Sequence, residues 1–222
     1  MNLKITLKSR LLLAALAFGL SASARAGEGP TAATTTAEGP MAPALSLGLL
    51  GQTYAGLTYS HINLDGAPVN ADSYGLEYNW ALNPGFDAVF NYDWAQSGLV
   101  AGERAREQTL TAALREFITT QRWGKPYVEA GIGYDWAKKF AGVKDRSFVW
   151  LVAAGVEFQA APALTITPFV RYTRTDGYDD EDTVNYGVKA NYWVTRQWAV
   201  TGGIDRSDDH DMTYKLGLNV SF

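Results

Sequence analysis

Residues 214–222 read YKLGLNVSF, and apolar side chains alternate with polar or small ones along the whole stretch. The apolar side chains are those of Tyr214, Leu216, Leu218, Val220 and Phe222. Because a β-strand directs successive side chains to opposite faces, this stretch predicts a strand with one apolar and one polar face. The fold of the whole chain then depends on whether the pattern is repeated elsewhere.

The pattern does recur: from residue 49 onward, units of about ten alternating residues are separated by turn residues. The fourth unit loses its alternation at Glu116 and Phe117, where we expect a β-bulge. Pro168 has no backbone donor for a strand ladder, so a closed barrel needs a bulge there as well. The predicted strands cover residues 50–62, 73–82, 86–96, 109–117, 126–137, 148–159, 164–175, 183–194, 197–206 and 214–222.

The connections between these strands alternate in length. Those after even-numbered strands are short, at 83–85, about 119–125, 160–163 and 195–196, and those after odd-numbered strands are longer and more charged, at 63–72, 97–106, 138–147, 176–182 and 207–211. Short turns on one rim and longer loops on the other are typical of up-and-down membrane barrels. We therefore predict an all-β fold: a single antiparallel up-and-down transmembrane β-barrel of ten strands, with eight as the alternative.

Aromatic side chains fall near the ends of the predicted strands, on their apolar face. Two girdles are expected of a spanning barrel, because amphipathic rings settle at the depth of the lipid headgroups. The predicted outer girdle contains Tyr59, Tyr74, Trp94, Trp136, Trp150 and Tyr172, and the inner girdle contains Trp80, Phe158, Tyr192 and Trp198. A soluble sandwich or lipocalin-like barrel would bury its aromatic side chains inside, so the pattern favours the membrane barrel.

The amino-terminal region predicts export. Residues 1–26 have a basic start, an apolar run at 11–20 and an Ala-Arg-Ala cleavage site at 24–26, which are the parts of a signal peptide. Residues 27–48 are rich in Gly, Pro, Ala and Thr and predict a flexible periplasmic leader, although threading into the lumen stays open. The barrel is predicted to occupy residues 49–222.

The charge balance limits the classes of partner. Removing residues 1–26 removes four basic residues and no acidic one, so the net charge changes from −4 to −8. A nucleic-acid partner is not expected, because phosphate backbones require clustered positive charge. The absence of cysteine in the sequence is compatible with an oxidising compartment.

Taken together, residues 49–222 resemble the small outer-membrane β-barrel proteins of Gram-negative bacteria, such as the transmembrane domain of outer-membrane protein A and related porin-like families. The resemblance rests on the strand pattern, the signal peptide and the terminal Phe222. It implies a monomer without a cofactor or metal in the bacterial outer membrane, in contact with membrane lipid and lipopolysaccharide. It also implies that the barrel-assembly machinery reads the insertion signal at 214–222.

The polar face of the predicted strands carries an excess of acid. The predicted lumen charge network contains Glu77, Asp87, Asp93, Arg115, Glu129, Asp135, Glu157, Arg171, Lys189, Asp205 and Lys215. Because charges shielded from bulk water must pair or stay solvated, we expect salt bridges, including one that joins Arg115, Glu129 and Glu157. Ten strands leave little room beyond side chains. The predicted function is a structural or small porin-like protein with a mostly salt-bridged lumen, and a narrow cation-favouring pore is the functional alternative.

The predicted outer loops suggest weaker alternatives. The acidic loops 176–182 and 207–211 contain enough oxygen ligands for Ca²⁺, but their spacing fits no defined calcium loop. Asp208 and His210, beside Asp180 and Asp182, resemble the omptin proteases, in which an Asp-His pair activates water opposite two acids; this chain is shorter and its acids lie on the adjacent loop. The lipid A deacylase pattern is absent at His61, and neither histidine has an evident partner.

Two further expectations concern the outer surface. The third loop is basic and is a candidate for contact with lipopolysaccharide phosphates through Lys138, Lys139, Lys144 and Arg146. A surface adhesin or ligand-binding barrel is the remaining alternative function, although the predicted outer loops are modest in length.

Overall fold

The computed structural model describes residues 48–100, 102–119, 124–138, 144–177 and 181–222. The predicted signal peptide and all of the predicted leader except Gly48 lie outside these residues, so both remain predictions. The strands are β1 (Tyr54–Asn63), β2 (Ala71–Asn83), β3 (Phe86–Ser97), β4 (Arg106–Phe117), β5 (Lys125–Lys138), β6 (Lys144–Ala161), β7 (Leu164–Asp176), β8 (Glu181–Trp193), β9 (Trp198–Ser207) and β10 (Met212–Ser221).

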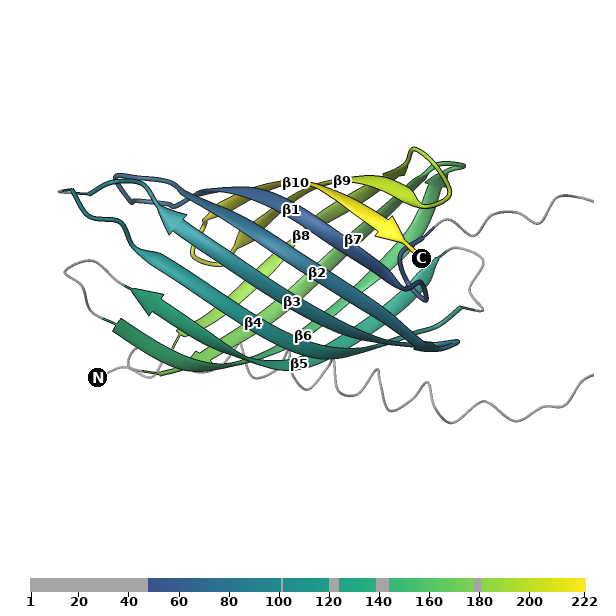
Figure 1. The fold of residues 1–222 in the computed structure, drawn as a ribbon, viewed down its shortest axis with the longest axis horizontal. Helices are drawn as coiled ribbons and strands as arrows, with labels where there is room; N and C mark the ends of the chain where they lie inside the picture. Colours follow the sequence, from purple (N-terminus) through teal and green to yellow (C-terminus); the bar gives the residue numbers. More distant parts are fainter. Residues whose placement is uncertain (1–47, 101, 120–123, 139–143, 178–180) are drawn as a thin grey trace, which may run out of the picture. The chain divides into compact units, whose positions relative to one another are not determined.

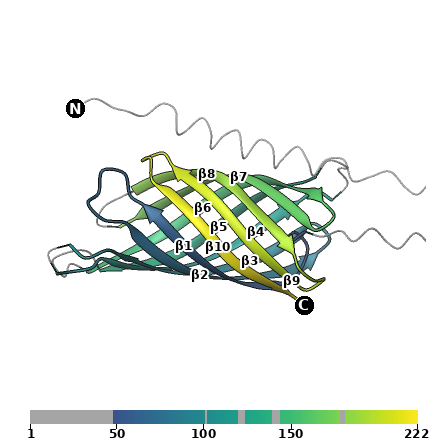
Figure 2. The same ribbon diagram turned by 90° about the horizontal axis from the view of Figure 1, so that it is seen from above.

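The ten strands form one closed antiparallel barrel, in which each strand pairs with its neighbours in sequence. The barrel closes between β1 and β10, where Tyr54 is opposite Ser221 and Asn63 is opposite Met212. Figure 1 shows these two strands side by side, and Figure 2 shows the same seam after a quarter turn. The prediction of ten strands in an up-and-down barrel is confirmed, and the eight-strand alternative is wrong.

The barrel has two different rims. The terminal rim contains Tyr54, Phe222 and the turns 84–85, 162–163 and 194–197, and it is where β4 ends and β5 begins. The loop rim contains the connections 64–70 and 208–211, and it is where β3, β5 and β7 end. In Figure 1 the terminal rim is on the right, where the chain ends. Among the described residues, no helix has the length and apolar character needed to cross a membrane.

The side chains alternate as a membrane barrel requires. Large apolar residues such as Leu57, Leu76 and Leu216 are exposed on the outside, each more than half accessible. The lumen is polar and buries, among others, Ser60, Asn79, Asp87, Thr111, Glu129, Glu157, Thr165, Asn191, Thr201 and Asn219. A soluble barrel would show the reverse distribution, because its apolar face would be the buried one.

Both predicted bulges are wrong in position. β4 keeps an unbroken register with β3 and β5, and Phe117 is a buried residue in phase with the inward face. The ladder between β6 and β7 shifts between Gln159 and Ala161, beside the turn, and its register is the same on both sides of Pro168. Phe117 therefore faces inward at the end of β4, although the interior of a membrane barrel is expected to be polar.

The predicted first strand begins too early, because residues 48–53 do not belong to the barrel wall. We call these residues the terminal plug. Leu49 and Leu50 are 4% and 5% exposed, and the chain turns at Gly51, where φ is 80° and the backbone N of Gln52 donates to the carbonyl O of Leu49. Glycine suits this turn because it reaches positive φ without a steric cost, and a Cβ at Gly51 would lie 3.0 Å from the Phe117 ring. The inward Phe117 therefore packs against the plug.

Candidate functional site

The lumen is the candidate site, and ion pairs cross it at mid-height. Arg115 on β4 contacts Glu129 on β5, with Nη2 and Nε of the arginine 2.6 and 2.8 Å from the same carboxylate oxygen, Oε2. Arg171 on β7 reaches the other oxygen of Glu129 at 3.8 Å. Glu129 is 3% exposed, so little water reaches its carboxylate, and the two arginines compensate its charge instead.

Two more pairs extend this layer around the barrel. The Nζ of Lys189 on β8 lies 3.8 Å from Glu77 on β2, and the Nζ of Lys215 on β10 lies 2.7 Å from Asp205 on β9. Glu77 also accepts a hydrogen bond from the hydroxyl of Tyr54. We call the residues of these four ion pairs the charged layer: Glu77, Arg115, Glu129, Arg171, Lys189, Asp205 and Lys215. They come from seven strands, so side chains of both signs surround most of the lumen, with two basic residues, Arg171 and Lys189, on the adjacent strands β7 and β8.

An aromatic ring supports the central arginine. The guanidinium of Arg115 lies 5.3 Å from the ring centroid of Tyr127, which is a cation–π geometry. Tyr127 has room to face inward because Gly155 lies beneath it; a Cβ at Gly155 would be 2.7 Å from the tyrosine ring. The glycine and the tyrosine therefore fix the place of the arginine across the lumen.

The predicted bridge through Glu157 is wrong, although the contact between Arg115 and Glu129 is present. The register of β5 and β6 places Glu129 opposite Ala153, while Glu157 is opposite Lys125. Glu157 therefore lies four residues nearer the terminal rim than the charged layer. Its Oε1 is 3.8 Å from the Nζ of Lys125. Lys125 was missed because its Gly-Lys-Pro sequence was assigned to a turn.

Inward carboxylates also hold the terminal plug. Glu157 Oε2 accepts a hydrogen bond of 2.8 Å from the backbone N of Leu49, and Asp87 Oδ2 accepts one of 3.1 Å from the backbone N of Gly51. The Nζ of Lys125 donates to the carbonyl O of Leu50 at 3.1 Å. Backbone donors and acceptors of the plug are thus satisfied by charged side chains of the wall, as buried polar groups require.

Apolar packing completes the seal at the terminal rim. Leu49 of the plug packs with the inward residues Tyr54, Trp193 and Ala199 in one buried cluster. Next to it, Asn191 accepts a hydrogen bond of 2.7 Å from Thr201. The alternation of the strands already puts Trp193 on the inward phase, but its role as a core residue was not predicted, because inward positions were expected to be polar and only the folded plug buries it.

A cavity of about 300 Å³ remains on the loop-rim side of the plug. Its lining on β1 begins at Thr58 and includes Ser60, and on other strands it includes Asp93, Thr109 and side chains of the charged layer. Asp93 is exposed to this space, and Asp135 nearby accepts a hydrogen bond of 2.9 Å from Thr109. The cavity is therefore a polar vestibule whose wall includes most side chains of the charged layer and no residue of the plug.

The predicted girdle residues lie on the outward phase of their strands. At the loop rim, Tyr59 and Tyr74 have ring centroids 5.5 Å apart, Tyr74 and Trp94 5.9 Å apart, and Trp150 and Tyr172 5.2 Å apart. Trp136, Trp80, Tyr192 and Trp198 are exposed, and Phe158 is partly exposed. The insertion-signal residues Tyr214, Leu216 and Leu218 are exposed on β10, and Phe222 at the end of the chain is 78% exposed.

The structure does not form the protease-like pair at the loop rim. His210 Nδ1 lies 3.0 Å from the carbonyl O of Asp208, while the carboxylate of Asp208 accepts a hydrogen bond from the backbone N of Val184. Asp180 lies outside the described residues. Asp182 is close to Arg174 and to the hydroxyl of Tyr172. Among the described residues, no group of three His, Asp or Glu side chains is placed to hold a metal ion.

The other histidine does have a partner, contrary to the prediction. His61 Nδ1 lies 2.9 Å from Asp72 Oδ1, which also accepts a hydrogen bond of 2.7 Å from the hydroxyl of Tyr59. The side-chain amide of Asn70 lies 3.4 Å from the other ring nitrogen of His61. The pairing of β1 with β2, which sets His61 opposite Asp72, could not be read from the sequence.

Comparison with known proteins gives similarity of shape only. No protein-family model matches the sequence, and no curated protein matches it.

Among solved structures, the KdgM porin in complex with disordered oligogalacturonate has a TM-score of 0.42 at 13% identity, covering 75% of this chain and 99% of that chain. Neisserial surface protein A has a TM-score of 0.44 at 14% identity, covering 77% and 96%. The outer-membrane protein Ail of Yersinia pestis has a TM-score of 0.40 at 14% identity, covering 78% and 99%. Similarity at this level transfers no ligand and no residue role.

The class of protein follows from the structure of the chain itself. A closed ten-stranded antiparallel barrel with an apolar, aromatic exterior and a polar, charged interior is a transmembrane β-barrel of the outer-membrane type. The resemblance inferred from the sequence is confirmed at the level of the fold.

Proposed function

We propose that the protein is a structural barrel of the bacterial outer membrane whose lumen is closed, and that it does not act as a general diffusion channel. The observation that carries this proposal is the terminal plug, held by Glu157 and Asp87 through backbone hydrogen bonds. An open porin of this size would need a continuous water path. Here the terminal plug and the charged layer both lie across that path, one after the other. In the proposed orientation the terminal rim faces the periplasm and the loop rim faces outward, as in bacterial barrels with an even strand number.

The charged layer supports closure in a second way. Glu129 has one oxygen shared by two nitrogens of Arg115 and lies near Arg171 through its other oxygen, so an ion that crossed the layer would have to displace paired side chains. Barrels with few strands are filled by their own side chains, and channels appear only in much larger ones. A ten-stranded barrel with seven charged side chains across its lumen therefore has little capacity for transport.

Planar-bilayer recordings of the refolded protein test this function. We expect no regular conductance steps from the wild-type protein. In the variant Leu49→Gly/Tyr54→Gly, which removes the apolar seal, we expect steps to appear. Val194→Asp is a matched control, since this exposed residue lies in a turn at the same rim and outside the lumen. Stable steps in the wild type, equal to those of the double variant, would contradict a closed lumen.

A further inference from the structure

Three basic side chains lie together on the outward face of the barrel at the loop rim. Arg106 on β4 is opposite Lys138 on β5, and Arg146 on β6 is opposite Trp136 on β5. We call Arg106, Lys138 and Arg146 the basic cluster. All three are exposed, and no carboxylate of the described residues forms an ion pair with any of them. Of the loop residues predicted from the sequence to be basic contacts, Lys139 lies outside the described residues and the side chain of Lys144 is not described.

The cluster has an electrostatic cost that no acidic side chain of the described part of the barrel relieves. Like charges directly opposite each other on neighbouring strands destabilise the pair, and this is the relation between Arg106 and Lys138. Another outward arginine of the same rim is paired with acidic residues: Arg174 on β7 lies 2.5 Å from Asp176 and 3.6 Å from Asp182. An anion bound from outside the chain would relieve the repulsion, and arginine forks suit phosphate oxygens.

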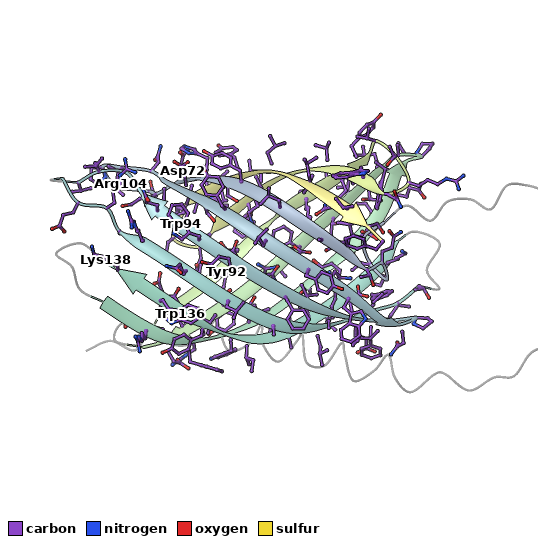
Figure 3. The ribbon with its side chains drawn as sticks, in the orientation of Figure 1. Asp72, Tyr92, Trp94, Arg104, Trp136 and Lys138 are labelled. Atoms are coloured by element: carbon purple, nitrogen blue, oxygen red, sulfur yellow. The ribbon has the colours of Figure 1, made fainter. Side chains whose placement is uncertain are left out.

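The depth of the cluster matches the headgroups of the surrounding lipid. One cross-strand row runs from Tyr74 through Trp94 and Gln108 to Trp136, and Arg106 and Lys138 occupy the next outward row toward the loop rim. Amphipathic rings mark the interface between hydrocarbon and headgroups, so the cluster lies where lipid phosphates lie. Figure 3 shows Trp94, Trp136 and Lys138 in the half of the barrel nearer the loop rim.

A groove adjoins the cluster and indicates which lipid would fit. It has a volume of about 550 Å³ and is lined by Tyr74 and Trp94, with the polar side chains of Asp72, Gln96 and Arg104. Gln96, which lines the groove, is opposite Arg106, so the groove and the cluster are neighbours on the barrel surface. Aromatic rings beside amide and carboxylate groups suit a sugar ring, which has an apolar face and polar edges. A glycerol phospholipid has no such ring, so the groove favours a phosphorylated sugar.

We propose that the basic cluster and the adjoining groove bind the phosphorylated sugar headgroup of lipid A, the membrane anchor of lipopolysaccharide, on one side of the barrel. The phosphates contact Arg106, Lys138 and Arg146, and the sugar lies against Trp94. The inference rests on the proposed placement in the outer membrane, whose outer leaflet contains this lipid. It does not depend on whether the lumen conducts.

The test uses full-length wild-type protein in detergent micelles, with purified bis-phosphorylated lipid A as the probe. Native mass spectrometry measures the bound fraction at increasing lipid concentration. We expect Arg106→Gln/Lys138→Gln to weaken binding by about 25-fold, roughly fivefold for each charge removed. Arg206→Gln is the matched control, because Arg206 is an exposed basic residue at the same rim on β9, opposite Tyr186. This control is expected to bind lipid A as the wild type does.

Two further arms make the result decisive. Fully dephosphorylated lipid A should bind the wild type and the double variant with equal affinity. Phosphatidylglycerol should bind the wild type more weakly than lipid A does, and the double variant should lose less affinity for it than for lipid A. Three results would each overturn the proposal. The first is equal affinity of the wild type and the double variant for lipid A, and the second is a loss of lipid A affinity in Arg206→Gln as large as that in the double variant. The third is a loss of phosphatidylglycerol affinity in the double variant as large as its loss of lipid A affinity. The heat-dependent gel mobility of each variant reports that the barrel has folded, and bilayer conductance of the same samples tests the closed lumen separately.

Discussion

Glu157 Oε2 accepts a hydrogen bond of 2.8 Å from the backbone N of Leu49, joining two points of the chain 108 residues apart. The carboxylate belongs to the barrel wall on β6, and the amide belongs to the terminal plug. A strand end and a pre-strand segment are thereby held together inside the lumen. The stability of the plug should depend on this single acceptor more than on any exposed polar residue nearby.

Glu157→Ala is therefore expected to release the plug without unfolding the barrel. A hydrogen bond to a charged group contributes about 1.5–3 kcal/mol, so hydrogen exchange of the Leu49 amide should accelerate by roughly 10–100-fold. Amide exchange followed by NMR measures this directly. Gln159→Ala is the matched control, because Gln159 is exposed on the same strand and donates to the nearby Pro162 carbonyl. Unchanged protection of Leu49 in Glu157→Ala would show that the plug is held by other contacts.

Arg115→Met should be among the most destabilising single substitutions in the lumen. It leaves Glu129, which is buried, without the two nitrogens that share its Oε2. Breaking a buried ion pair from one side costs about 3–5 kcal/mol, whereas replacing both partners by apolar residues is often close to neutral. Urea unfolding in lipid vesicles should therefore show a large loss for Arg115→Met and recovery of most of it in Arg115→Met/Glu129→Leu. A double variant no more stable than the single one would mean that the pair does not act as a unit.

Gly155→Ala should disturb the ring that supports Arg115. The new Cβ would lie 2.7 Å from the Tyr127 ring and 2.7 Å from the carbonyl O of Pro168, so the ring or the strand must shift. Overpacking of this kind costs about 1–3 kcal/mol in the free energy of unfolding. Gly202→Ala provides the comparison, because a Cβ at Gly202 would meet no atom within 4 Å. If both variants unfolded at the same urea concentration, the close approach at Gly155 would be without consequence.

Leu57→Arg tests the outward apolar face. Leu57 is 55% exposed and is opposite Leu76 and Leu218, so its surroundings in the membrane are hydrocarbon. An arginine on the lipid face near the bilayer midplane costs about 2–4 kcal/mol. In a water-soluble barrel the same exposed substitution would change stability little. Unfolding from lipid vesicles, with Leu57→Met as the conservative control, distinguishes the two situations.

The sequence alone predicts which face of each strand meets lipid, because the two-residue period survives in all ten strands. Leu57, Trp80 and Leu216 are outward and Glu77, Arg115 and Lys215 are on the inward phase, as their alternation indicates. Turn chemistry and aromatic positions predict the strand number and the two rims. These are local properties, and each can be read within about ten residues.

Which inward side chains meet in the lumen depends on the register between neighbouring strands. The register is not a local property of the sequence. Alternation says that Glu129 and Glu157 face inward, but only the β5–β6 register decides that Glu129 lies opposite Ala153 and Glu157 opposite Lys125. Trp193 was placed inward by its phase, yet its role as a core residue depends on Leu49 folding back against it. A segment that enters its own barrel has no periodic signal, so threading was considered only for residues 27–48, and residues 49–53 of the plug were assigned to the barrel.

Cysteine accessibility tests the closed lumen most directly, because the natural sequence contains no cysteine to react. Ser60→Cys places a thiol in the cavity, and Ala199→Cys places one in the buried cluster behind the plug. With a membrane-impermeant maleimide on proteoliposomes, we predict labelling of Ser60→Cys and protection of Ala199→Cys from either side of the membrane. Equal and rapid labelling of both thiols in the folded barrel would contradict a lumen sealed at the terminal rim.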